Sequence, residues 1–225
     1  MTWSLPAEWI LPQGEMFYQK FKRRGEMYSM TEPDWKIAEK YLTTKRIAVD
    51  VGAYVGQETV RYAENFLRVI SFEPLYHEIL EANVRHLDNV LMSKVALSNQ
   101  RGMAEMVAAA GNTGASAIMN EDNEEIIRKS ALSFKTHLPP IRVPTHTLDS
   151  YQLDGVDFIK IDTEGHVLPV LEGAIETLKE NNFPLLQIEL NKLNPKIDEC
   201  HKFLNDLGYE LVETYHVDHF FKHKS

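Results

Sequence analysis

The chain has 225 residues, of which 44% are hydrophobic, and a formal net charge of −9. This size fits one domain with a full core, and the acidic balance argues against a nucleic-acid partner held through its phosphates. Cys200 is the only cysteine, which excludes an intrachain disulfide and a cysteine-rich metal site. No apolar run reaches the roughly 18 to 20 residues of a membrane span, and the N-terminus lacks a signal-peptide core, so we expect a cytoplasmic protein with no membrane partner.

The first 45 residues precede the regular part of the chain. Residues 1–31 are irregular and rich in aromatic side chains, and a helix is predicted from Glu32 to Leu42 with Pro33 in its first turn. We therefore expect residues 1–45 to form an N-terminal cap on a domain that runs from residue 46 to residue 225. The sequence indicates no oligomeric state.

From residue 46 onward, predicted strands and helices alternate. Strands are expected at 46–51, 68–73 and 90–97, with helices at 56–66 and 76–87 between them. Successive strands joined by crossover helices are typical of a parallel sheet.

The alternation is interrupted after the third strand. A strand is predicted at 103–108, but small and polar residues fill 109–137 before the next strand at 141–145. Within this stretch only a weak helix, Glu121 to Lys129, is predicted. We expect residues 109–137 to be an insertion that serves as a lid.

Regular elements return in the last third of the chain. Strands are predicted at 156–161 and 185–190, helices at 167–180 and 196–207, and two closing strands at 209–214 and 217–222. The short gap between the closing strands favours a hairpin, because a parallel crossover takes about a dozen residues or more. The sequence predicts an α/β fold whose mostly parallel sheet ends in an antiparallel strand.

The turn after the first core strand is the most informative motif. Asp50 ends that strand, Gly52 and Gly56 follow in a D-x-G-x-x-x-G pattern, and Glu73 lies 21 positions beyond Gly52. Glycines allow a sharp turn and the close approach of a ligand, and an acid at about this spacing accepts ribose hydroxyls. The motif predicts a pocket for a nucleoside cofactor, with a purely structural turn as the alternative.

The residues of this turn distinguish between cofactors. A dinucleotide fingerprint reads G-x-G-x-x-G, whereas Ala53 and Tyr54 follow Gly52 with no middle glycine. Asp50 would repel a pyrophosphate and attract an ammonium group. S-adenosylmethionine carries an ammonium, a sulfonium and a ribose but no phosphate, so it is favoured over NAD, and an NAD-dependent oxidoreductase is the less favoured alternative.

Acidic and amide side chains also follow two later strands. Asp162 and Glu164 come after one strand, and Glu189 and Asn191 end the next. Because ligands bind outside the carboxyl ends of parallel strands, we expect Asp162 to face the cofactor crevice, with capping of the next helix as the alternative.

These motifs together resemble a known family. The segments that carry the likeness are 49–56, Phe72-Glu73-Pro74, Val95-Ala96-Leu97-Ser98, Thr147-Leu148-Asp149, 159–165 and 170–174. They look like the FkbM family of S-adenosylmethionine-dependent methyltransferases, and the likeness runs from Arg46 to Asn191. Tyr54 replaces the asparagine usual in the family, and we expect this to matter little because the side chain lies in a turn.

The resemblance implies a Rossmann-like class I methyltransferase fold with seven strands in its sheet. It implies O-methylation of a hydroxyl on a small molecule, such as a sugar or a polyketide. The cofactor would be held by Asp50, Gly52, Ala53, Tyr54, Gly56, Glu73, Pro74, Ala96, Leu97, Ser98 and Asp162. Asp50 and Gly52 would line its methionine end, Glu73 would hold the ribose, and 96–98 would approach the adenine. A non-catalytic scaffold that keeps the fold and the cofactor is a further alternative.

Methyl transfer to a hydroxyl requires that the acceptor be positioned and deprotonated. Asp162, Glu164 and His166 lie within one turn and are the candidate bases, although a histidine is also common on the surface. Asp162, Glu189 and Asn191 would offer the oxygen ligands that Mg²⁺ prefers. The alternative for Glu189 is a helix cap or a buried partner for Lys160.

Overall fold

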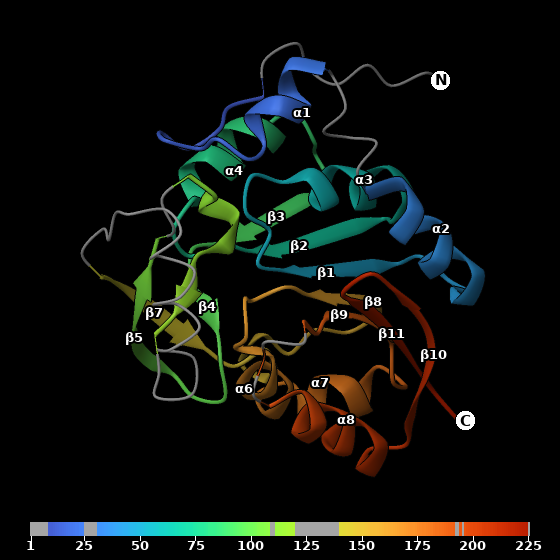
Figure 1. Ribbon diagram of the computed structural model, residues 1–225. Coiled ribbons are helices and arrows are strands. Elements are labelled where there is room, and N and C mark those ends of the chain that lie inside the picture. Colours follow the sequence, from blue (N-terminus) through green and yellow to red (C-terminus); the bar gives the residue numbers. More distant parts are fainter. Residues whose placement is uncertain are drawn as a thin grey trace.

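The computed structural model describes residues 9–24, 31–108, 111–119, 140–191, 194 and 196–224. In these ranges, seven strands form one sheet in the order β10-β11-β9-β8-β1-β2-β3, and four short strands form a second sheet in the order β4-β7-β5-β6. Helices cover both faces of the seven-stranded sheet, and the second sheet lies beyond the ends of its central strands (Figure 1). None of the helices in the described ranges has the length and hydropathy of a membrane span.

The larger sheet is parallel except for its last strand. Its strands are β1 (Ile47–Val51), β2 (Arg68–Phe72), β3 (Val90–Ser93), β8 (Val156–Ile161), β9 (Leu185–Glu189), β10 (Tyr209–Tyr215) and β11 (Asp218–His223). β11 runs antiparallel to both β9 and β10, whereas the other neighbouring pairs are parallel. This confirms the predicted α/β fold. The strand order reverses between β1 and β8, so the carboxyl ends of these two strands flank the crevice in which such sheets bind ligands.

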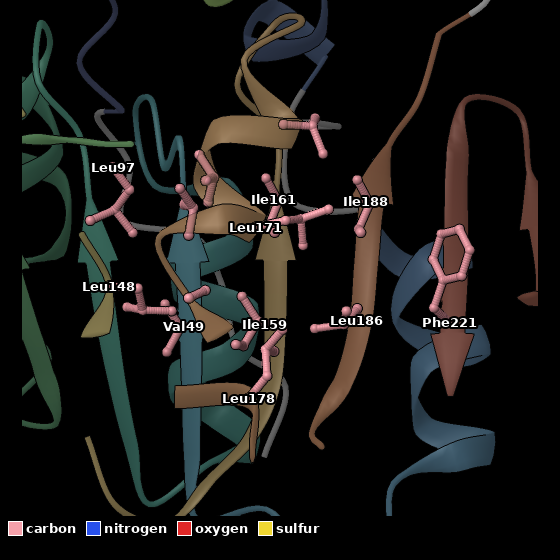
Figure 2. Close-up of a cluster of buried hydrophobic side chains, with 14 of the residues drawn as sticks. Val49, Leu97, Leu148, Ile159, Ile161, Leu171, Leu178, Leu186, Ile188 and Phe221 are labelled. Carbon is pink, nitrogen blue, oxygen red and sulfur yellow. The ribbon is translucent and has the colours of Figure 1, made fainter. Parts of the chain in front are cut away.

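Side chains of the central strands alternate between two hydrophobic clusters, as the period of a strand requires. Val49 and Ile161 pack with α6 (Val167–Glu172), α7 (Ile175–Glu180) and α8 (Ile197–Asp206) in the cluster shown in Figure 2. On the opposite face, Ala48 and Phe158 pack with side chains of α2 (Glu32–Tyr41) and α3 (Gln57–Asn65). The sheet is therefore buried on both faces, which explains its nearly continuous apolar strands.

The predicted strand 90–97 is wrong, because the chain divides there into two strands of different sheets. β3 ends at Ser93, and β4 (Ala96–Leu97) pairs with β7 (Ile141–His146) of the second sheet. The second sheet also contains β5 (Gly102–Val107) and β6 (Ala117–Ile118). Short helical turns cover 113–115 and 149–151.

The predicted helix 167–180 is also two helices, α6 and α7, which meet at Gly173. The carboxylate of Asp149 accepts hydrogen bonds from the backbone N–H and the hydroxyl of Thr177, at 2.7 and 2.8 Å, and so caps the start of α7. A Cβ on Gly173 would overlap the backbone carbonyl of Ser98. The break therefore lets the chain pass close to the turn after β4.

The described parts of the N-terminal region pack directly on this domain. Trp9 is buried with residues of α3 and α4 (His77–Val84), and α1 (Gln19–Arg24) lies next to α4 (Figure 1). The predicted helix Glu121 to Lys129 and most of the expected lid, 109–137, lie outside the described residues. The division into a cap and a domain at residue 45 stays a prediction.

Candidate active site

A cavity lies at the carboxyl ends of the central strands. Gly52 follows β1, Glu73 follows β2, Asp162 follows β8, and Glu189 ends β9; all four line it. These are the strand-end positions at which the sequence predicted chemistry. Their convergence follows from the parallel sheet, which brings the ends of these strands to one edge.

Gly52 is required where the turns after β1 and β8 meet. Its φ is +82°, and a Cβ at this position would overlap the backbone carbonyl of Asp162. Gly56, with a φ of +97°, does not line the cavity; a Cβ there would lie 2.9 Å from side-chain carbons of both Leu80 and Val84. The first glycine thus joins two strand ends, and the second lets α3 pack on α4.

Asp50, predicted with Gly52 at the methionine end, does not line the cavity, and neither does Ala53, which was predicted to bind the cofactor. Asp50 is fully buried on the opposite face of β1 from Val51, and the hydroxyl of Thr59 donates to its Oδ2 at 2.6 Å. Burial raises its pKa, while Lys160 acts in the opposite direction. Side chains of a strand alternate between faces, so Asp50 points away from Val51 and stabilises the turn after β1 from the opposite face of the sheet.

The carboxylate of Glu73 organises the cavity wall at the end of β2. It accepts backbone N–H bonds from Tyr54 at 2.9 Å, Leu75 at 2.7 Å and Tyr76 at 2.9 Å. Burial raises its pKa to about 7, although these donors act to lower it. The Tyr54 bond goes to Oε2 and the other two go to Oε1, which leaves Oε2 with an acceptor position for a further donor.

Tyr54 does more than the sequence suggested. Its φ is +49°, as a turn residue allows, but its side chain lines the cavity instead of leaving it. Its hydroxyl lies 2.7 Å from the hydroxyl of Thr113 and donates to Glu15 at 3.1 Å. The expectation that this position matters little is therefore wrong.

The predicted adenine side is only partly in the cavity wall. Pro74, Ala96 and Leu97 line it, whereas the hydroxyl of Ser98 lies 3.0 Å from Nε2 of His166. His166 lines the cavity at the start of α6, and burial, with a smaller effect of the Lys196 charge, lowers its pKa to about 4. His166 is thus neutral at pH 7 and a weak base.

Three carboxylates gather in the cavity wall. Oxygens of Asp162, Glu164 and Glu189 lie within 4.8 Å of one another, and Asp162 and Glu189 share a hydrogen bond. The charge of Asp162, together with burial, raises the pKa of Glu189 to about 11. Burial, together with Asp162, raises the pKa of Glu164 to about 8. The cluster therefore holds protons at neutral pH because its negative charges repel one another.

Lys160 is the cation that this cluster contains. Its Nζ donates to Oδ2 of Asp162 at 2.9 Å, and the lysine is only 4% exposed. Burial favours the neutral amine, but the field of Asp162 and of further buried acids outweighs burial and raises the pKa of Lys160. Burial also acts on Asp162, yet Lys160 keeps its pKa below the ordinary value. The alternative that Glu189 is the partner of Lys160 is wrong.

The predicted metal ligands are only partly brought together. Asp162 and Glu189 are neighbours, as expected, but the third carboxylate beside them is Glu164, and Asn191 does not line the cavity. Three carboxylate oxygens suit a divalent cation in their chemistry. Any such ion would share Asp162 with the ammonium group of Lys160.

Residues 50–211 match the methyltransferase FkbM domain. This chain belongs to the FkbM methyltransferase family. The match covers more than half of the chain and confirms the resemblance seen in the sequence motifs.

Two solved structures and one further protein are similar to this chain. A methyltransferase FkbM from Methylobacillus flagellatus KT has a TM-score of 0.55 and 17% identity over 80% of this chain and 44% of that protein. A ribosomal protein L11 methylase from Lactobacillus delbrueckii subsp. bulgaricus has a TM-score of 0.50 and 9% identity over 91% and 80% of the two chains. At these identities the likeness shows the fold alone.

A Dictyostelium discoideum protein named as a candidate methyltransferase is 35% identical over 86 residues. The matched part is 36% of this chain and 32% of that protein. This chain therefore spans less than half the length of this relative, and 44% of the length of the Methylobacillus protein.

Sequence reasoning missed several residues that line the cavity. Tyr18 comes from the N-terminal region, Glu58 from the first turn of α3, and Met106 and Ile118 from the second sheet. Burial raises the pKa of Glu58 to about 7, although Lys160 acts to lower it. Only Glu58 carried a local signal, an acid just after the glycine turn.

Proposed function

We propose that this FkbM methyltransferase uses S-adenosylmethionine to methylate a hydroxyl group of a small molecule, such as a sugar or a polyketide. The observation that carries the proposal is that Gly52, Glu73 and Asp162 line one cavity at the point between β1 and β8 where the strand order reverses. The cavity has an acid placed for ribose hydroxyls and further carboxylates for a cationic ligand. No cluster of basic side chains in its described wall suits a pyrophosphate.

Within this proposal, different residues of the cavity wall bind different parts of the cofactor. Glu73 would accept a ribose hydroxyl through the free position on Oε2. Pro74, Ala96 and Leu97 offer an apolar surface for the adenine. The backbone of Gly52 lines the cavity and would lie beside the methionine part of the cofactor. S-adenosylmethionine supplies a methyl group already activated on a sulfonium, so the protein's remaining task is to orient and deprotonate the acceptor.

Glu164 is the best placed of the three candidate bases. Asp162 is paired with Lys160, and its lowered pKa makes it a weak proton acceptor. His166 has a pKa of about 4 and is tied to Ser98. Glu164 lines the same cavity, and its pKa of about 8 suits proton transfer near neutral pH.

A Mg²⁺ ion is the second element of the proposal. Asp162, Glu164 and Glu189 would hold it through carboxylate oxygens, and in that case Glu164 would be a ligand and not the base. Such an ion lowers the pKa of a hydroxyl bound to it, which would reduce the demand on the base. Turnover that survives exhaustive chelation, in protein shown by elemental analysis to be free of metal, would remove this element.

Calorimetry and turnover together test the main proposal. S-adenosylhomocysteine should bind the full chain and NAD should not; the reverse result would indicate an oxidoreductase. Transfer of a tritiated methyl group should then be measured to sugars and phenols, and in parallel to RNA and protein. Cofactor binding without transfer to any hydroxylated acceptor would favour the scaffold alternative, and transfer to RNA or protein alone would refute the small-molecule acceptor.

A further inference from the structure

The cavity wall has two halves that come from different parts of the chain. The half proposed for the cofactor is built on strand ends of the large sheet. The other half includes Tyr18 from the N-terminal region, Met106 from β5, and Gly114 and Ile118 from the described part of the insertion, residues 111–119. Met106 and Ile118 pack with Ala96, beside the surface proposed for the adenine, so Tyr18 and Gly114 are the part of this wall left to an acceptor.

Tyr18 packs between the insertion and the glycine turn. A Cβ built on Gly114 would lie 3.0 Å from the Tyr18 ring, and the ring centroid is 5.4 Å from that of Tyr54. Besides burial, the charges of Glu58, Asp162 and Glu164 act on the Tyr18 hydroxyl and raise its pKa. The ring is therefore packed on two sides, against Gly114 of the insertion and against Tyr54 of the glycine turn.

Glu15 holds Tyr18 in this place. This carboxylate is only 3% exposed, and its Oε1 accepts the backbone N–H of Tyr18 at 2.9 Å. Its Oε2 accepts the backbone N–H and the hydroxyl of Thr113, both at 2.6 Å, and the hydroxyl of Tyr54 at 3.1 Å. The backbone N–H groups of Met16 and Phe17 also donate to the carbonyl of Gly111, at 2.9 and 3.0 Å. One buried carboxylate thus joins the N-terminal region, the insertion and the glycine turn.

We propose that Tyr18, held in the cavity wall by Glu15, is the residue that sets the size of the acceptor. The inference rests on the proposed function, because it assumes that S-adenosylmethionine occupies the strand-end half of the cavity. The ring of Tyr18 then limits the space in front of the transferred methyl group. Glu15 is a positioning residue that acts through Tyr18 and does not itself line the cavity.

A matched pair of stable cofactor analogues tests this without knowledge of the natural acceptor. In both, a nitrogen replaces the sulfur of S-adenosylmethionine; one carries a methyl group on that nitrogen and the other a benzyl group. The benzyl group projects into the acceptor half. The measured quantity is the ratio of the two dissociation constants, obtained by calorimetry on the full-length protein.

The wild-type protein should bind the methyl analogue more tightly than the benzyl analogue. Tyr18→Ala and the less disruptive Tyr18→Leu should reduce this preference by about tenfold or more, since each tenfold corresponds to only about 1.4 kcal/mol. Tyr18→Phe keeps the ring and should retain the wild-type ratio. Tyr41→Leu, on the distant helix α2, controls for the loss of a tyrosine elsewhere.

Glu15→Gln should also reduce the preference for the methyl analogue. The NH2 group of the glutamine cannot accept a hydrogen bond, so at least one of the four donors that now bond to the Glu15 carboxylate would lose its acceptor. In the Glu15→Gln, Tyr18→Leu double variant the two effects should not add, since both act through the same ring. An unchanged ratio in Tyr18→Ala and Tyr18→Leu, with both analogues still bound, would overturn this inference alone. Failure of the wild-type protein to bind S-adenosylhomocysteine or either analogue would overturn the proposed function and this inference with it.

Discussion

Replacement of Gly52 by alanine tests the geometry at the centre of the site. The residue has a φ of +82°, and an added Cβ would overlap the carbonyl of Asp162. Left-handed backbone costs an L-residue about 1 to 2 kcal/mol, and forcing apart two packed backbone segments adds about 1 to 3 kcal/mol. Gly52→Ala should therefore lower the free energy of unfolding by about 2 to 5 kcal/mol.

The chain offers a matched control for this prediction in Gly14. Gly14 has a φ of +84°, and a Cβ there would meet no atom within 4 Å. Gly14→Ala should therefore show the backbone cost alone, about 1 to 2 kcal/mol. Urea unfolding followed by circular dichroism gives both values, and calorimetry with S-adenosylhomocysteine should show that only Gly52→Ala also weakens binding. Equal destabilisation by the two substitutions would refute the close contact between the turns after β1 and β8.

Three further changes address separate parts of the molecule. Glu73→Ala should weaken S-adenosylhomocysteine binding by about 1 to 3 kcal/mol through loss of the ribose acceptor, and an unchanged dissociation constant would contradict its role. Asp149→Ala removes the cap of α7 and should cost about 0.5 to 2 kcal/mol of stability in urea unfolding, with little effect on cofactor binding. Burial raises the pKa of Glu58 in the folded state to about 7, above the ordinary glutamate value of 4.5. The folded state therefore keeps the proton to a higher pH, and the stability that this group contributes falls as pH rises from 4.5 to 7. Glu58→Gln should flatten that fall, whereas Glu81→Gln on the exposed face of α4 should not; identical pH profiles for wild type and Glu58→Gln would exclude the shift.

The strand-end residues could be predicted because two local signals coincide. Three of the apolar strands, β2, β8 and β9, end in an acid or are followed directly by one, and the crossover helices require these strands to be parallel, so Glu73, Asp162 and Glu189 had to meet at one edge. The position of Asp50 was misjudged although the same strand period places it with Ala48, away from Val51. The errors in the element boundaries have a similar origin, because an apolar run through residues 90–97 does not reveal which of two sheets each half joins.

The sequence by itself determined the fold class, the cofactor motif and the family, because all three depend on short spacings that the chain order preserves. Only the tertiary structure decided how the cavity is closed. Glu15 meets Thr113 across 98 positions of the chain, and neither lies in a motif or a periodic segment. The buried Glu15 carboxylate accepts its four hydrogen bonds only because three separate segments of the chain pack together around it. No local sequence pattern predicts that these segments are neighbours. Both the sequence and the structure explain Gly52. The sequence marks it as a turn residue, and the structure shows that the backbone carbonyl of Asp162 leaves no room for the Cβ of any other residue.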